Sequence, residues 1–190
     1  MRLFVLSLNG SPHSDGNCAA LLKYIGKILA DNGAEYKIIN VSEAVLSAKS
    51  PFCTACSSPC KGVCFKGTAL ETAFEDMIRA DFIIAASPVY FGTVSAQLKA
   101  LFDKSRAIRG KLTGKSGSAI AVGGARFGGQ ETTIKAVHDM LLVHGMSIVG
   151  DGSAESGAGH QGVCASAPAS EDTFAFTRAE ALAERIISLK

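Results

Sequence analysis

The chain has no tryptophan, few charged side chains and no block of basic residues. Its net charge is only +2, with both signs interspersed, so the sequence gives little support to nucleic-acid binding. No apolar run approaches membrane-spanning length, and the start Met-Arg-Leu-Phe lacks the pattern of a signal peptide. We therefore expect a cytoplasmic protein that binds neither nucleic acid nor membranes.

The composition also limits the fold. Hydrophobic residues make up 47% of the chain and charged residues 19%, which is typical of an α/β protein whose sheet is buried on both faces. A chain of 190 residues is long enough for one substantial core and short for two. We therefore expect a single domain over residues 1–190.

The first segment has the pattern of a buried strand, a hydroxyl-rich turn and a helix. Residues 3–8 form an apolar run, residues 9–17 contain serine, glycine and asparagine, and apolar residues then recur at helical spacing up to Asn32-Gly33. A helix N-terminus leaves backbone N–H groups unpaired and carries partial positive charge. This turn is therefore a candidate phosphate-binding site.

The residues of the turn exclude several classes of phosphate-binding loop. Five residues separate Gly10 from Gly16, whereas a nucleoside-triphosphate loop has four residues between its glycines and then a lysine. The glycine triplet of a dinucleotide site is absent, and the strand at 36–39 ends in Asn40 rather than in an acidic residue. No basic residue closes the turn after Cys18, as a cysteine-dependent phosphatase would need. What remains is a loop that binds one terminal phosphate through hydroxyls and backbone amides.

Strands and helices alternate along the rest of the chain. Further strands are predicted at 82–86, 118–122 and 146–149. Thr68 and Glu71 have the spacing of a capping box before a helix at 70–79, and a loose Gly/Ser/Ala stretch follows the last strand before a final helix. This alternation predicts a parallel sheet covered on both sides. The loops after the first, third and fourth strands would then meet at the carboxyl ends of the strands, where such sheets bind ligands.

Four cysteines lie close together in a long connection at about 41–67. Cys53, Cys56, Cys60 and Cys64 fall within twelve residues, and the connection is longer than a compact α/β unit needs. A disulfide framework is not expected in a reducing compartment. Close thiolates suit an iron-sulfur cluster or a tetrahedral metal such as zinc; a redox-active set without metal and reduced structural thiols remain open.

Three motifs lie at the ends of the first, third and fourth predicted strands. They are Gly10-Ser11-Pro12-x-x-x-Gly16-Asn17, Ser87-Pro88-Val89-Tyr90-Phe91-Gly92 with Gln97-Leu98-Lys99 behind it, and Gly123-Gly124. Over roughly residues 1–150 the chain resembles the flavodoxin-like NADPH-dependent FMN reductases, above all the branch that includes the iron-sulfur flavoproteins. The resemblance implies a doubly wound, five-stranded parallel sheet in the order 2-1-3-4-5 with helices on both faces.

The resemblance also implies a site for FMN. The phosphate would be held by Ser11, Pro12, His13, Ser14, Gly16, Asn17 and Cys18, and the flavin ring by Pro88, Val89, Tyr90, Phe91, Gly92, Gly123, Gly124 and Arg126. For the phosphate, the donors would be the hydroxyls of Ser11 and Ser14 and backbone amides at the helix start. Plainer interpretations are a helix cap, an ordinary turn, a solvated loop histidine for His13 and a surface arginine for Arg126.

Related iron-sulfur flavoproteins hold a [4Fe-4S] cluster in this same connection, so Cys53, Cys56, Cys60 and Cys64 become its candidate ligands. This chain departs from their usual spacing, with three residues rather than two between its second and third cysteines. Cys18 and Cys164 stand alone, and no metal is expected at their thiols.

These features predict an FMN-dependent oxidoreductase that takes a hydride from NAD(P)H and passes electrons to a quinone, a free flavin or a small redox partner. No side-chain acid or base is expected, because the flavin performs the chemistry. Two alternatives are an iron-sulfur flavoprotein that only carries electrons, and a redox or metal sensor that acts through the cysteine loop. The resemblance further implies a homodimer or homotetramer.

Overall fold

A computed structural model describes residues 2–152 and 160–189 of the chain. The strands are β1 (Phe4–Asn9), β2 (Glu35–Asn40), β3 (Phe82–Pro88), β4 (Ser116–Gly123), β5 (Ser147–Ile148) and β6 (Val163–Ser166). The α-helices are α1 (Asn17–Asp31), α2 (Val41–Leu46), α3 (Ala69–Arg79), α4 (Ala96–Lys104), α5 (Gln130–Val143) and α6 (Thr173–Ser188). Two short 3₁₀ helices, η1 (Ser105–Ile108) and η2 (Ala169–Glu171), complete the described elements.

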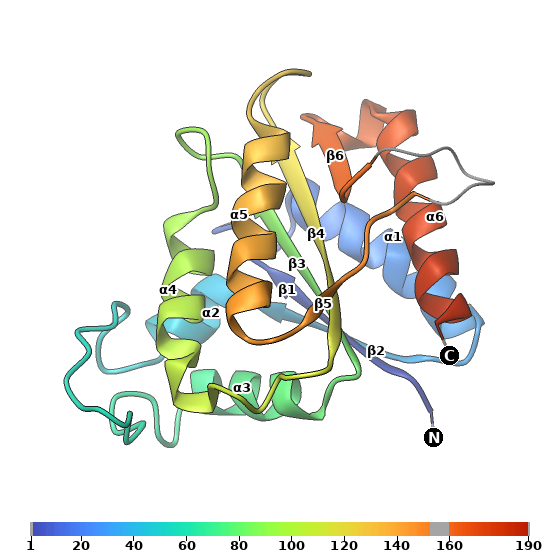
Figure 1. The fold of residues 1–190 in the computed structure, drawn as a ribbon. Coiled ribbons are helices and arrows are strands. Elements are labelled where there is room, and N and C mark those ends of the chain that lie inside the picture. Colours follow the sequence, from blue (N-terminus) through green and yellow to red (C-terminus); the bar gives the residue numbers. More distant parts are fainter. Residues whose placement is uncertain (1, 153–159, 190) are drawn as a thin grey trace.

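The strands form one parallel sheet in the order β2-β1-β3-β4-β5, which confirms the predicted topology. Successive strand residues point to opposite faces, so Val5 packs with α1 and α6 while Leu6 packs with α2, α3, α4 and α5. Figure 1 shows these two helical layers on either side of the sheet. The burial of both faces explains why β1 and β3 are continuous apolar runs.

A sixth strand lies in the stretch where the sequence indicated only loose structure. β5 pairs with the start of β4 through Ser116 and Gly117, and β6 pairs with its end, from Ile120 to Gly123. The two short strands therefore share one side of β4. The sequence signal for β6 was weak because only its alternate residues are buried, with Val163 at 0% and Ala165 at 2% exposure.

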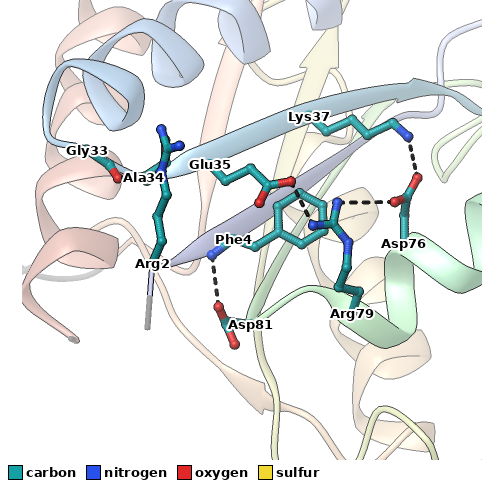
Figure 2. A network of polar contacts seen from close by, with 9 residues as sticks. All are labelled: Arg2, Phe4, Gly33, Ala34, Glu35, Lys37, Asp76, Arg79 and Asp81. Atoms are coloured by element: carbon teal, nitrogen blue, oxygen red, sulfur yellow. Dashed lines mark hydrogen bonds and ion pairs between the residues drawn. The ribbon is translucent and has the colours of Figure 1, made fainter.

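A polar network fixes the amino end of the sheet (Figure 2). The Asp81 carboxylate accepts a hydrogen bond from the Phe4 backbone N–H at 2.8 Å, and the Arg79 guanidinium lies 3.8 Å from the centre of the Phe4 ring. Arg79 also pairs with Glu35 at 2.8 Å, and so joins α3 to β2. Asp76 of α3 pairs with Lys37 of β2 at 2.5 Å. These contacts hold β1, β2 and α3 in register at the end of the sheet opposite the predicted site.

Two local features differ from expectation. The Thr68 side chain does not cap α3, because its hydroxyl donates to the Phe65 carbonyl at 2.6 Å. The reciprocal bond of the capping box does not form either, because the Thr68 N–H donates to the Phe65 carbonyl and the Glu71 carboxylate accepts from the Gly67 N–H at 2.7 Å. The short helix α2, inside the cysteine-bearing connection, was not predicted.

Within the residues that the structure describes, no helix has both the length and the apolarity needed to cross a bilayer.

Candidate functional site

The loop after β1 is held tightly against the neighbouring strand. The Gly10 N–H donates to the Ala86 carbonyl at 2.8 Å, and the Gly10 carbonyl accepts from the Ser95 hydroxyl at 2.5 Å. A Cβ on Gly10 would lie 2.6 Å from the Ala86 oxygen and 2.9 Å from the Leu98 Cβ. Only glycine fits this position, so the first loop is fixed directly over the end of β3.

The start of α1 is left open to a ligand. Gly16 occupies the N-cap position, and no side chain of the described residues caps the helix there. The first turn carries no acidic residue, so the partial positive charge of the helix end is not neutralised from within the turn. The buried Ser11 hydroxyl accepts from the His13 N–H at 3.1 Å and keeps its own proton available as a donor. A Cβ on Gly16 would lie 4.0 Å from the Ser11 hydroxyl oxygen, so this hydroxyl lies next to the free helix end, where a phosphate could bind.

The remaining residues of the first loop are divided between solvent and structure. His13 and Ser14 are exposed. The Asn17 side chain accepts from the Ala169 N–H at 2.8 Å, which ties α1 to η2. Cys18 is buried, and burial raises the pKa of its thiol to about 12, so this residue can offer only its backbone amide to a ligand.

Lys23 forms an ion pair with the acid of the first loop, a contact that the sequence analysis missed. Its ammonium lies 2.7 Å from the Asp15 carboxylate, and this contact lowers the pKa of Asp15 through hydrogen bonding and charge. Asp15 is the acid within the first loop, so its pairing reduces the repulsion that a phosphate would meet there. The eight-residue separation between the two has no simple helical signature, which is why spacing did not reveal it.

The loop after β3 forms a tight turn at the same end of the sheet. Tyr90 and Thr93 exchange backbone hydrogen bonds of 2.9 and 3.2 Å, and the residues between them, Phe91 and Gly92, have φ values of 49° and 80°. Positive φ at both central residues is the geometry of a type I′ turn. Among the described residues no acceptor is bonded to the Phe91 or Gly92 N–H, and the Phe91 side chain is fully exposed. The turn therefore presents free amides and an aromatic ring.

The loop after β4 packs directly on this turn. Gly129 has a φ of 90°, and a Cβ there would lie 3.2 Å from Val89 Cγ1 and 3.4 Å from Gly92 Cα. The Thr132 hydroxyl bonds to the Gly92 carbonyl at 2.9 Å. Gln130 is buried and braces the loop from inside, donating to the Ala125 carbonyl at 2.6 Å. The sequence analysis missed these two side chains, because a polar residue in a helix start looks like ordinary surface.

The predicted ring-binding residues at the third loop differ in burial. Gly123 is buried, and a Cβ there would lie 2.5 Å from the Gln130 amide nitrogen, whereas Gly124 has open space around it. Arg126 is exposed and lies 5.5 Å from the ring centre of Phe127, which is itself 93% exposed. Both side chains border a pocket of about 940 Å³ between this loop, β6 and the start of α6. The pocket lies beside the three loops rather than between them.

The four clustered cysteines lie on the long loop between α2 and α3, at the far side of the fold from the three loops (Figure 1). None of them forms a disulfide, and all except Cys56 are partly buried. In the described ranges no three potential metal ligands come together. One of the four cysteines contacts a charged side chain: the Cys64 sulfur lies 3.4 Å from the Lys104 ammonium. As a donor set the cysteines suit iron and sulfide, but they are not gathered as a cluster requires.

FMN, by contrast, fits the arrangement of the three loops. The uncapped helix end matches a phosphate, and the free amides and exposed aromatic side chain of the second loop match a planar ring with polar edges. The close approach at Gly129 keeps the second and third loops together. Fold and loops thus define a class: flavodoxin-like α/β proteins that bind a phosphorylated flavin at the carboxyl ends of their strands.

Comparisons with known proteins identify the family within this class. Residues 2–161 match the family described as NADPH-dependent FMN reductase. An iron-sulfur flavoprotein of Methanocaldococcus jannaschii is 40% identical over 163 residues, which cover 84% of this chain and 82% of the relative. The iron-sulfur flavoprotein of Methanosarcina thermophila is 37% identical, with 96% of this chain and 92% of the relative covered.

A solved apo structure of an NADH:FMN oxidoreductase superposes with a TM-score of 0.71, at 19% identity over 99% of this chain and 90% of the other. At this identity the superposition shows the shared fold alone. The family match and the two curated relatives carry the assignment further. The chain belongs to the NADPH-dependent FMN reductase family and is an oxidoreductase.

Proposed function

We propose that the chain binds FMN at the three loops and oxidises NAD(P)H. The main support is that the uncapped start of α1 and the glycine-bearing loops after β3 and β4 lie at the same end of the sheet. The phosphate would bind to Ser11, Pro12, His13, Ser14, Gly16, Asn17 and the Cys18 amide. The ring would lie against Pro88, Val89, Tyr90, Phe91, Gly92, Gly123, Gly124 and Arg126.

When bound, FMN would supply the hydride-accepting chemistry, and the protein would supply position and charge. Backbone N–H groups at Phe91 and Gly92 would donate to the polar edge of the ring and favour extra negative charge there. Thr132 would hold this turn through the Gly92 carbonyl, and Gln130 would brace the third loop, which packs on the turn. No side chain of the three loops is proposed as an acid or base.

Rapid mixing of the FMN-loaded protein with NADPH under anaerobic conditions tests the enzyme proposal. We expect the visible flavin absorbance to bleach many times faster than that of free FMN at the same concentration. NADH serves as the matched donor, because it lacks only the 2′-phosphate that the exposed Arg126 would attract. Bleaching no faster than the free-flavin background would reject the reductase and favour an electron carrier that never meets a nicotinamide.

The acceptor would be a quinone, a free flavin or a small redox partner, all of which can approach an exposed ring. Phe91 and Phe127 are almost fully exposed beside the proposed ring site, so this end of the molecule is open to a planar acceptor. Steady-state oxidation of NADPH with each acceptor class in turn ranks them. A rate that is the same with and without every acceptor would reject this part of the proposal.

We further propose that Cys53, Cys56, Cys60 and Cys64 ligate a [4Fe-4S] cluster after the loop closes around it. The support is the four free thiols on one loop and two relatives named iron-sulfur flavoproteins. Iron and sulfide analysis of protein purified without oxygen, together with its visible spectrum, is the test. Zinc without sulfide would replace the cluster by a tetrahedral metal site, and neither metal would leave the sensor or structural alternatives.

A homodimer or homotetramer is proposed as the working assembly. Cys64 lies by Lys104 at the end of α4, whereas the first residue of that helix follows Ser95, which contacts the first loop. Nine helical residues span about 13 Å, so one chain keeps its cysteines and its flavin loops well apart. A second copy could bring a cysteine loop to a flavin. Analytical ultracentrifugation tests this, and a monomer at micromolar concentration would reject it.

A further inference from the structure

Asn9 is a buried amide at the junction of β1 and the first loop. It is the last residue of β1 and is 0% exposed. Its side-chain oxygen accepts from the Ser11 N–H at 3.2 Å, and its nitrogen donates to the His13 carbonyl at 3.1 Å. The same nitrogen donates to the side-chain oxygen of Asn40 at 3.2 Å. One side chain therefore holds the loop at two points and also joins it to β2.

The partners of Asn9 require an amide side chain. The Ser11 N–H can only donate and the His13 carbonyl can only accept, so the oxygen and nitrogen of Asn9 cannot exchange places. Asn40 pairs with Asn9 at the ends of β2 and β1, and its own nitrogen donates to the Glu43 carboxylate at 3.2 Å. This contact leaves the Asn40 oxygen to accept from Asn9. A chain of side chains thus orients Asn9, starting at the exposed Glu43.

The His13 carbonyl lies next to the start of α1. A Cβ on Gly16, which occupies the N-cap position, would lie 3.9 Å from the His13 oxygen. A carbonyl oxygen carries partial negative charge, so it would repel a phosphate bound at this helix end if it faced the ligand. The oxygen accepts instead from the fully buried Asn9 side chain, which holds it toward the protein interior. The N–H groups of the helix end are then left to meet the anion.

We propose that Asn9 is a positioning residue for the FMN phosphate: it shapes the first loop so that the His13 carbonyl faces away from the phosphate and the Ser11 hydroxyl stays beside it. The inference rests on the proposed FMN site. Asn9 does not itself contact the ligand, because its side chain is fully buried and both of its polar atoms are bonded within the protein. Its removal should therefore weaken binding of the phosphate and spare binding of the ring.

The test compares Asn9→Ala with Asn32→Ala, using the fluorescence of FMN and of riboflavin, which lacks the phosphate, to titrate each flavin-free protein. Asn32 lies at the other end of α1, where its side chain donates to the Ile28 carbonyl at 2.9 Å. For Asn9→Ala we expect the Kd for FMN to rise about tenfold or more and the Kd for riboflavin to change by less than about twofold. Asn32→Ala should leave both Kd values near those of wild type.

Asn9→Asp gives a second readout, which also serves if Asn9→Ala does not fold. An ionised carboxylate has no proton to donate to the His13 carbonyl, so at about pH 9 this variant should bind FMN more weakly than wild type. Burial raises the pKa of such a carboxyl, and protonation gives it one O–H donor. The FMN affinity relative to wild type should therefore recover partly as the pH falls to about 6. A ratio that does not change with pH would contradict the donor role of Asn9.

The outcomes separate this inference from the proposed function. Equal losses of FMN and riboflavin affinity in Asn9→Ala, or no loss of either, would overturn the role of Asn9 and leave the FMN site standing. If wild type binds FMN no more tightly than riboflavin, the phosphate part of the proposed site fails and this inference fails with it. If wild type binds neither flavin, the whole FMN proposal fails.

Discussion

Charged side chains have different roles at the two ends of the sheet. At the amino end, Glu35, Lys37, Asp76 and Arg79 pair with one another across β2 and α3 (Figure 2). At the carboxyl end the loops contain hydroxyls, glycines and free amides, and their acid Asp15 is paired off by Lys23. At the amino end, ion pairs hold the strands in register. At the carboxyl end, backbone N–H groups have no hydrogen-bond partner within the described residues, and such free N–H groups can bind a phosphate dianion with few cations.

The largest effect should come from breaking the close packing at the carboxyl end. In Gly10→Ala the new methyl group meets the Ala86 carbonyl at 2.6 Å, so β1 and β3 must move apart or the loop must shift. We expect a loss of about 1–3 kcal/mol in the free energy of unfolding and loss of FMN retention. Urea unfolding and flavin fluorescence measure the two. Gly124→Ala is the control for unfolding, since nothing lies within 4 Å of a Cβ there.

Adding a charge to the open helix end should separate binding from stability. Asn17→Asp keeps the acceptor for the Ala169 N–H but places a negative charge in the first turn of α1. The helix dipole should stabilise the ligand-free protein by about 0.3–1 kcal/mol. Repulsion should weaken FMN binding by at least about tenfold, or about 1.4 kcal/mol.

Riboflavin is the matched ligand for Asn17→Asp, because it has the ring of FMN but no phosphate. Its affinity should hardly change in this variant. Equal losses for FMN and riboflavin would show that the phosphate does not bind at the start of α1.

Two buried histidines of α5 and its end should make stability depend on pH. Burial lowers the pKa of both His138 and His144, with the Arg109 charge adding to the shift at His144. Their ordinary value is 6.5, so below it the unfolded chain binds more protons than the folded one. Stability should therefore be full above pH 6.5 and fall as the pH drops through the lowered values.

Urea unfolding as a function of pH checks this prediction. The variant His144→Gln should flatten the acid limb, even though it also loses the 2.7 Å contact with the Ser105 hydroxyl. An acid limb as steep as that of wild type would contradict a contribution from His144.

The smallest effect should come from the amino end. Asp76→Asn removes the charge that pairs with Lys37 and Arg79, whose side chains are 44% and 52% exposed. Partly exposed ion pairs contribute about 1 kcal/mol or less, so we expect a small, salt-sensitive loss of stability. FMN affinity should not change, because the network lies at the opposite end of the sheet. A large fall in affinity would mean that the two ends are coupled.

The topology could be predicted from the sequence because buried parallel strands and amphipathic helices have strong periodic signals. The run from Leu3 to Leu8 and the apolar spacing up to Asn32-Gly33 identify β1 and α1. β6 was missed because it is short and half-buried. The capping box was wrong because both the hydroxyl and the N–H of Thr68 donate to the Phe65 carbonyl in the preceding turn.

The candidate site could be predicted only where local chemistry defines it. Glycine, serine and proline motifs identified the three loops, but not the side chains that hold them together from other elements. Gln130, Thr132 and Ser95 act through contacts between residues far apart in sequence. The buried Lys104 follows the same rule, since its partner Cys64 lies 40 positions earlier. Such pairs become visible only once the chain is folded.

The division of the outer strand between β5 and β6 has a consequence for solubility. A sheet border is a template on which a foreign strand can dock, and its reach depends on how many consecutive backbone groups it offers. Here the border consists of pieces of two and four residues. Neither is long enough to recruit another molecule firmly, so this border resists extension from one copy to the next, whereas β2 at the opposite border offers six consecutive residues.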